Sequence, residues 1–169
     1  MSTTPSPNVV GVKEHKLSQQ LKDKLTELAT QFPDKNSVII PALHVIQDEY
    51  GWVSPEAIRE LAELFNIATN KVFGVASFYT MFNKKPVGKY HIQICRNVAC
   101  SLRGSKQILD HVTKELGIEP GEVTKDGKYS ITTVECLGSC GSAPVMMIND
   151  TYYENLTEEK VDQIIKSLE

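Results

Sequence analysis

The four cysteines of this chain fall into two short clusters, and the side chain of each can act as a thiolate. Cys95 and Cys100 are separated by four residues and Cys136 and Cys140 by three, while 35 residues lie between the two pairs. Close pairs joined by a long connection indicate one site built from two loops. Because thiolates are good ligands for soft metals, the pattern predicts a metal centre and electron transfer rather than catalysis on a substrate.

The spacings of four and three residues within the pairs disfavour several kinds of metal or redox site. Zinc sites generally use pairs separated by two residues, so zinc is disfavoured without being excluded. A thioredoxin-type dithiol needs Cys-x-x-Cys, and a plant-type ferredoxin needs a further cysteine soon after the four-residue pair; the sequence has neither. Two disulfides would suit an oxidising compartment, so they are a weaker prediction for a cytosolic chain.

Length, composition and charge set the class of protein. The 169 residues, 41% of them hydrophobic, suffice for one medium domain or a small domain with a helical extension. The net charge of −3 gives no electrostatic basis for binding nucleic acid. No apolar run approaches the ~20 residues of a membrane-spanning helix, so we expect no membrane insertion. The first 16 residues contain no apolar signal core and no arginine, so we expect a cytoplasmic protein.

The segment before the first cysteine predicts a helical domain. Residues 1–16 are polar and aperiodic, and we expect a flexible tail there. Over residues 17–84 apolar side chains recur every three or four positions, which predicts a four-helix domain. The expected helices cover residues 17–32, 37–50, 54–65 and 69–78.

The period of the pattern changes after residue 85, and residues 85–169 predict an α/β domain with a mixed sheet. The order is strand, helix, strand, strand, strand, helix, with Asn149-Asp150 as a tight hairpin turn between the last two strands. Because a right-handed crossover joins the first two strands, we expect them to be parallel neighbours. The expected strands are 90–94, 129–134, 144–148 and 151–153, and the expected helices are 101–116 and a last one from residue 157.

Both cysteine pairs follow predicted strands. Cys95 ends the first strand, Cys100 is expected at or just before the N-terminus of the next helix, and Cys136 and Cys140 follow the second strand. If those strands are neighbours, both loops leave the same end of the sheet and four thiolates can converge. A helix N-terminus there would favour thiolates and an anionic centre.

The two cysteine pairs, followed by Ala143-Pro144-Val145, resemble the thioredoxin-like [2Fe–2S] ferredoxins. From about residue 17 to the C-terminus the chain also resembles the E subunits of bacterial NADH:quinone oxidoreductase. The segments that carry this resemblance are IPALHVIQDEYGWVSPEAI, VFGVASFYTMF, ICRNVACSLRG and CLGSCGSAPVMMINDTYYENLT. It implies an α+β architecture: an N-terminal helical bundle followed by a thioredoxin-like domain. Because thioredoxin folds often place a cis proline beside the site, a cis Ala143–Pro144 bond is compatible with it.

The resemblance also implies the site and its partners. It implies a [2Fe–2S] cluster bound by Cys95, Cys100, Cys136 and Cys140. FMN and NADH would lie on a partner flavoprotein subunit, beside other peripheral-arm subunits on the inner face of the cytoplasmic membrane. We expect no catalytic residue on this chain, which lacks dinucleotide and phosphate-loop motifs.

Other assignments stay open at this point. An NAD-linked hydrogenase, a formate dehydrogenase or an electron-bifurcating complex can carry an equivalent subunit. Two different classes of protein also remain: a zinc-stapled interaction module, which would hold one zinc on the four thiolates, and a thiol-based redox enzyme.

Overall fold

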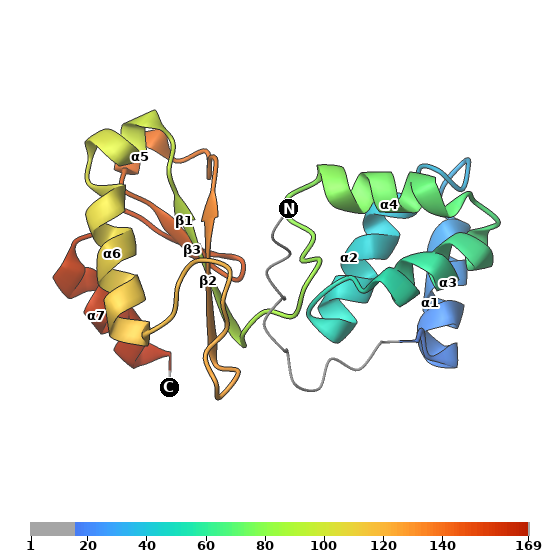
Figure 1. Cartoon of the computed structure of the whole chain (residues 1–169). Coiled ribbons are helices and arrows are strands. Elements are labelled where there is room, and N and C mark those ends of the chain that lie inside the picture. Colours follow the sequence, from blue (N-terminus) through green and yellow to red (C-terminus); the bar gives the residue numbers. More distant parts are fainter. Residues whose placement is uncertain (1–15, 169) are drawn as a thin grey trace, which may run out of the picture. The chain divides into compact units, whose positions relative to one another are not determined.

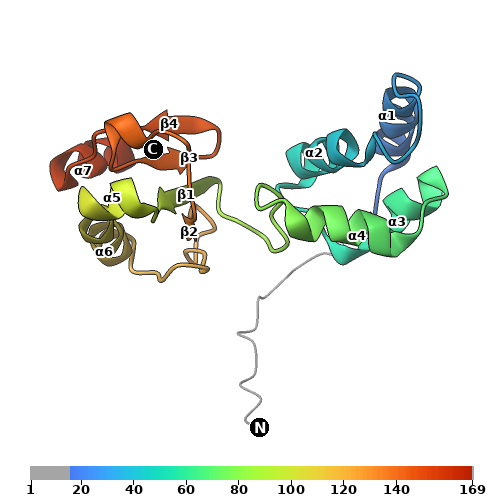
Figure 2. The ribbon, with the colours of Figure 1, turned by 90° about the horizontal axis from the view of Figure 1, so that it is seen from above.

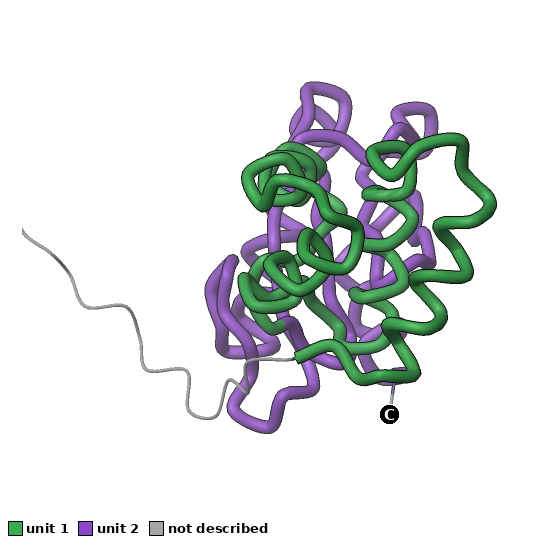
Figure 3. The backbone as a smooth tube through the Cα atoms, turned by 90° about the vertical axis from the view of Figure 1, so that its right-hand side faces the viewer, with its two compact units in different colours: residues 1–86 green, residues 87–169 purple. Residues whose placement is uncertain are grey.

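A computed structural model describes residues 16–168 of the chain. The chain divides into two compact units, residues 1–86 and residues 87–169 (Figure 3). The sequence pattern predicts a division between residues 84 and 85. Apart from Lys16, the expected tail lies outside the described residues. None of the helices within residues 16–168 has both the length and the apolar character needed to cross a membrane.

The first unit contains four helices (Figures 1 and 2). Two of them begin at serines that cap the free backbone N–H groups: Ser18 Oγ accepts from Leu21 N–H at 3.2 Å and Ser54 Oγ from Ala57 N–H at 3.0 Å. Gly51, with a φ of 77°, ends the second helix in the left-handed conformation. The helices are α1 (Gln19–Ala29), α2 (Ile39–Tyr50), α3 (Pro55–Phe65) and α4 (Thr69–Phe78).

The helical pattern overestimates the first helix, which covers 19–29 rather than 17–32. The backbone beyond Ala29 continues in turns, with Gln31 N–H donating to Leu28 O at 3.1 Å, so Phe32 still packs against the core. Pro41 is the third residue of α2, where a backbone N–H has no partner within the helix in any case. The helix therefore accommodates this proline in its first turn.

One apolar core holds the first unit together. Its fully buried members come from all four helices and include Leu25, Leu43, Leu61 and Val72. Removing this surface from water is the main stabilising term for such a small helical unit. Glu60 on α3 adds a polar link to the start of α1, because its carboxylate accepts from Leu17 N–H at 2.9 Å and lies 3.0 Å from Lys22 Nζ.

The second unit is a four-stranded mixed sheet with helices. The strand order is β2-β1-β3-β4; β1 and β2 are parallel, and the other two pairs are antiparallel. This pairing confirms the expectation that the first two strands are parallel neighbours. The strands are β1 (Tyr90–Cys95), β2 (Tyr129–Val134), β3 (Met146–Ile148) and β4 (Thr151–Tyr153). Asn149, with a φ of 52°, makes the expected turn between the last two.

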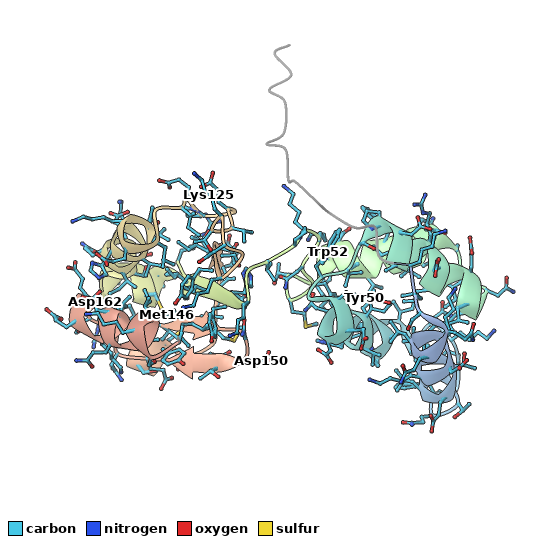
Figure 4. The ribbon with its side chains drawn as sticks, turned by 90° about the horizontal axis from the view of Figure 1, so that it is seen from below. Tyr50, Trp52, Lys125, Met146, Asp150 and Asp162 are labelled. Atoms are coloured by element: carbon cyan, nitrogen blue, oxygen red, sulfur yellow. The ribbon has the colours of Figure 1, made fainter. Side chains whose placement is uncertain are left out.

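Helices α6 (Ser105–Leu116) and α7 (Glu158–Ser167) cover one face of the sheet (Figures 1 and 2). Apolar residues of the sheet and of both helices form one core, in which Met146, labelled in Figure 4, is fully buried. The two helices also meet through a polar contact, with His111 Nε2 of α6 lying 2.6 Å from Asp162 Oδ1 of α7.

The single helix expected over residues 101–116 is two helices in the structure. A short helix, α5 (Val98–Leu102), precedes α6 and ends at Arg103. Gly104 lies between them with a φ of 93°, a conformation that α-helical residues do not adopt and that favours glycine. The sequence pattern missed this break, and it therefore misplaced Cys100 outside a helix.

Candidate metal centre

The parallel pairing of β1 and β2 sets the position of both cysteine loops. Cys95 is the register partner of Val134 at the carboxyl ends of the two strands. The pairing continues one residue further, because Arg96 N–H donates to Val134 O at 3.0 Å. The loop after β1 and the loop after β2 therefore begin side by side at the same end of the sheet.

The chain that returns from the second loop lies on the other side of Cys95. Cys95 N–H donates to Val145 O at 3.2 Å, which extends the antiparallel pairing of β1 with β3. The Ala143–Pro144 bond just before it is cis. A short 3₁₀ turn, η1 (Cys140–Ser142), joins the Cys136 loop to this segment. Cys95 thus lies between β2, which enters the second cysteine loop, and the segment at Val145, which leaves it.

Cys100 lies inside α5 rather than before a helix. Asn97 caps α5, with its side-chain oxygen accepting from Val98 N–H at 2.7 Å. The short helix turns Cys100 inward, where it is 2% exposed, next to Cys95, which is 3% exposed. These two cysteines form a small apolar cluster with Ala143 and Val145. The α5 helix lies beyond one end of the sheet (Figure 1).

The four cysteine side chains come together in pairs. Cys95 interacts with both Cys100 and Cys136, and Cys100 interacts with Cys95 and Cys140. Cys136 and Cys140 are exposed, and all four are free thiols. The structure therefore places Cys95 next to Cys100 and Cys136, and Cys100 near Cys140, with the first two buried and the other two at the surface.

The two buried thiols differ in their acidity. Burial raises the pKa of Cys95, but hydrogen bonds from the backbone of Asn97 and Leu137 and from two cysteines hold it below its ordinary value. Burial, with a hydrogen bond and a charge interaction from Cys95, raises the pKa of Cys100 to about 11. Adjacent thiols cannot both ionise easily unless a cation compensates their charge. The pair would therefore give up both protons most readily to a bound metal.

Backbone N–H groups lie close to the sulfur atoms of Cys95, Cys100 and Cys136. Gly138 N–H donates to Cys136 Sγ at 3.3 Å, and Gly138 has a φ of 75°, which lets the loop turn its amide toward the sulfur. Backbone hydrogen bonds also reach Cys95 from Leu137 and Cys100 from Val145. Such donors stabilise thiolate sulfur and tune the potential of a metal bound to it.

The charged residues near the site pair with carboxylates. Arg96 forms an ion pair with Glu135, and Lys106 lies 2.6 Å from Asp110 in the next turn of α6. Both pairs are exposed, and such surface ion pairs contribute little to stability. Within residues 16–168, no three His, Cys, Asp or Glu side chains already have the arrangement of a metal site, so the cysteines adjoin in pairs rather than as one closed set of ligands.

A segment that the sequence pattern did not reveal holds the second cysteine loop. Glu154, directly after β4, accepts hydrogen bonds from the hydroxyl groups of Ser139 and Ser142. Tyr152 OH donates to Leu137 O at 3.1 Å. The sequence did show polar side chains at the end of the last strand. Their hydrogen-bond partners, however, lie 12 to 15 residues away, so no local pattern connects them.

A family model for the thioredoxin-like [2Fe–2S] ferredoxins matches residues 25–169. The chain belongs to this family. The cofactor of the family is a [2Fe–2S] cluster, and the residues present fit such a group. The four thiols interact in pairs at one end of the sheet, Cys95 and Cys100 are buried in apolar surroundings, and Gly138 N–H donates to Cys136 Sγ.

Relatives with known names match most of the chain. It is 41% identical over 152 residues to the E subunit of the NADH-quinone oxidoreductase of Aquifex aeolicus (strain VF5), with 90% of this chain and 95% of the relative covered. It is 48% identical over 135 residues to the corresponding E subunit of Rickettsia bellii (strain RML369-C), covering 79% and 81%. The relatives are thus subunits of an oxidoreductase complex, and they match over most of their length.

The fold also occurs in a solved structure. An NAD+-reducing [NiFe]-hydrogenase in the H2-reduced state matches with a TM-score of 0.67 over 78% of this chain and 22% of that chain. The two sequences are 24% identical there, so the likeness concerns the fold alone.

Proposed function

We propose that Cys95, Cys100, Cys136 and Cys140 bind one [2Fe–2S] cluster and that this chain is the electron-transfer subunit of a NADH-oxidising complex. The observation that carries the proposal is that the two cysteine loops begin side by side at the carboxyl ends of β1 and β2, with Cys95 next to Cys100 and Cys136. When bound there, such a cluster would supply one-electron transfer, because it accepts and releases one electron at a time.

The two cysteine pairs would hold the cluster from different sides, one buried and one exposed. The buried pair, Cys95 and Cys100, lies among apolar side chains that exclude water from one side of the site. The exposed pair, Cys136 and Cys140, is held at the surface by its loop. An exposed side suits electron exchange with a partner, because electron transfer requires a short distance to the next centre.

Replacing ligands one at a time tests the assignment. We expect Cys95→Ser and Cys136→Ser each to lower the iron bound per chain or to shift the visible absorption of the protein. Val98→Ala is a matched control, because it changes the exposed surface of α5 near Cys100 and removes no thiol. Unchanged iron content and spectra in all four Cys→Ser variants would overturn the ligand assignment. One zinc and no iron in the purified chain would instead favour an interaction module.

The partner we propose is a flavoprotein subunit that binds FMN and NADH. The proposal rests on the relatives, which are named as E subunits of NADH-quinone oxidoreductase at 39–48% identity. The complex would place this chain in its peripheral arm, beside other peripheral-arm subunits, on the inner face of the cytoplasmic membrane. The hydrogenase likeness is compatible with a second parent complex, but at 24% identity it is the weaker guide.

Mixing the purified chain with the FMN-binding subunit encoded by the same genome tests this partnership. We expect the two to elute together on gel filtration. We also expect NADH to bleach the visible absorption of this chain in the mixture and not in the chain alone. Separate elution without bleaching would contradict the partnership and leave the ligand assignment intact.

A further inference from the structure

The two halves of the cysteine site are held in place by different means. Cys95 and Cys100 are buried, so packing fixes them. Cys136 and Cys140 are exposed, and the η1 turn that begins at Cys140 contains no buried residue. Leu137, next to Cys136, packs against the apolar cluster of Cys95 and Cys100, whereas the η1 turn at Cys140 contributes no residue to it. Hydrogen bonds must therefore hold the turn at Cys140 in place.

Those hydrogen bonds come from one short segment, residues 152–155, which we call the clamp segment. Tyr152 OH donates to Leu137 O at 3.1 Å, and Asn155 N–H donates to Ser142 O at 2.7 Å. Leu137 lies between the two cysteines of the loop, and Ser142 lies two residues after the second of them. The clamp segment thus contacts the loop on both sides of Cys140.

Glu154 makes the central contact of the clamp segment. Its Oε1 accepts from Ser142 Oγ at 2.7 Å and from Ser139 Oγ, and the two hydroxyl oxygens lie 2.8 Å apart. Ser139 directly precedes Cys140 in the sequence. One carboxylate oxygen therefore joins both ends of the turn at residues 139–142, in which Cys140 is the second residue.

The clamp segment is itself firmly anchored. Lys160 Nζ of α7 donates to Glu154 O at 2.5 Å, and Leu156, 5% exposed, is part of the main core of the unit. Leu156 N–H donates to Pro144 O at 3.2 Å, which ties the segment to the chain that returns from the loop. The backbone that carries the Glu154 side chain is therefore fixed from the core side, as a positioning group requires.

We propose that Glu154 is a positioning residue that sets the place of Cys140 through Ser139 and Ser142. The proposal rests on the assignment of the four cysteines as cluster ligands. Its role depends on the acceptor oxygen rather than on the negative charge, because the contacts are hydrogen bonds from hydroxyl groups. A positioning role differs from a general contribution to folding in one respect: substitution of Glu154 should affect only the loop at residues 136–142.

The test compares three variants of the full chain. Glu154→Ala removes the acceptor, Glu154→Gln keeps an acceptor oxygen and removes the charge, and Asp150→Asn removes a charge from the same hairpin without touching the loop. Asp150, labelled in Figure 4, lies in the turn between β3 and β4. Three readouts are taken: hydrogen exchange of the loop in the metal-free chain, iron release to a chelator, and the EPR spectrum of the reduced chain.

We expect Glu154→Ala to exchange the amides of residues 137–142 faster, with β1 and β2 unchanged, and to release iron about tenfold faster. Its EPR line shape should change, because one thiolate ligand is less well placed. In all three readouts, Glu154→Gln should be close to the wild type and Asp150→Asn should be the same as the wild type. Equal effects of Glu154→Gln and Glu154→Ala would overturn the positioning role in favour of a charge effect. Faster exchange throughout the unit, or an unchanged Glu154→Ala protein, would overturn it as well.

The same experiments separate this proposal from the one on which it rests. A wild-type chain that binds no iron would refute the ligand assignment, while the hydrogen-exchange comparison would still decide whether Glu154 holds the loop. An iron-loaded wild type with an unresponsive Glu154→Ala variant would refute the positioning role alone.

Discussion

Cys95 and Val134 face each other at the carboxyl ends of two parallel strands. This one register relationship places the loop of Cys95 and Cys100 beside the loop of Cys136 and Cys140. A slip of the register by one residue would move Cys95 away from Leu137, whose backbone contributes a hydrogen bond to its sulfur. The site therefore depends on the pairing of β1 with β2, and residues that secure this pairing are expected to affect it.

Gly88 is the first of these residues, because it lies against the backbone of β2. A Cβ atom at Gly88 would come within 2.4 Å of Tyr129 C and 2.8 Å of Ser130 N. We expect Gly88→Ala to force the start of β1 away from β2 and to destabilise the second unit by about 1–3 kcal/mol. Hydrogen exchange of the β1 and β2 amides measures this effect.

Gly74 is the matched control for the same substitution. It lies within α4, and a Cβ atom there would meet nothing within 4 Å. Gly74→Ala should stabilise the first unit by about 0.5–1 kcal/mol, because alanine is the better helix former. Equal effects of the two substitutions would contradict the close approach at Gly88.

His91 makes the stability of the second unit depend on pH. It is buried in β1, its Nδ1 lies 2.8 Å from Ser130 Oγ, and burial lowers the pKa of its imidazole below the ordinary value of 6.5. As the pH falls below about 6.5, the unfolded chain binds a proton that the folded protein does not. The free energy of unfolding should therefore fall with pH until the folded pKa is passed.

Urea unfolding at pH 7.5 and pH 5.5, followed by circular dichroism, checks the His91 prediction. We expect His91→Gln to lose less stability than the wild type between these two pH values, since glutamine does not titrate. If the wild type were instead stabilised relative to the variant at pH 5.5, the folded pKa of His91 would have to be raised and the prediction would be wrong.

Glu60 should contribute to the stability of the first unit. Its side chain is 14% exposed and accepts from Leu17 N–H and Lys22 Nζ, so Glu60→Ala would leave both donors without this partner. We expect a loss of about 1–3 kcal/mol. The fluorescence of Trp52, the only tryptophan of the chain, reports unfolding of this unit. Glu63→Ala, at an exposed position of the same helix, should change stability by less than about 0.5 kcal/mol.

Local patterns predicted the elements that carry the site. The alternation in residues 90–94 and the β-branched run at 129–134 indicated two strands, and the crossover rule made them parallel neighbours, as the structure confirms. The break at Gly104 was missed, because the apolar spacing of residues 101–116 also fits one continuous helix. Asn97, a good N-cap residue, was the signal for the true start of α5.

Long-range polar contacts could not be predicted in the same way. Glu154 lies 15 residues from Ser139 and on the far side of a hairpin, and no periodic pattern connects them. Their contact follows from the pairing of β3 with β4 and from the path of the chain after η1. Sequence reasoning therefore located the expected ligands but not the segment that holds the exposed pair.

The central claim is that four cysteines of this chain bind one binuclear iron–sulfur cluster. Iron and sulfide analysis of the anaerobically purified chain, with EPR after dithionite reduction, tests it most directly. We predict about two irons and two sulfides per chain, visible absorption that bleaches on reduction, and a signal of about one spin per chain. A colourless chain with one zinc, or iron that persists after all four cysteines are replaced by serine, would contradict it.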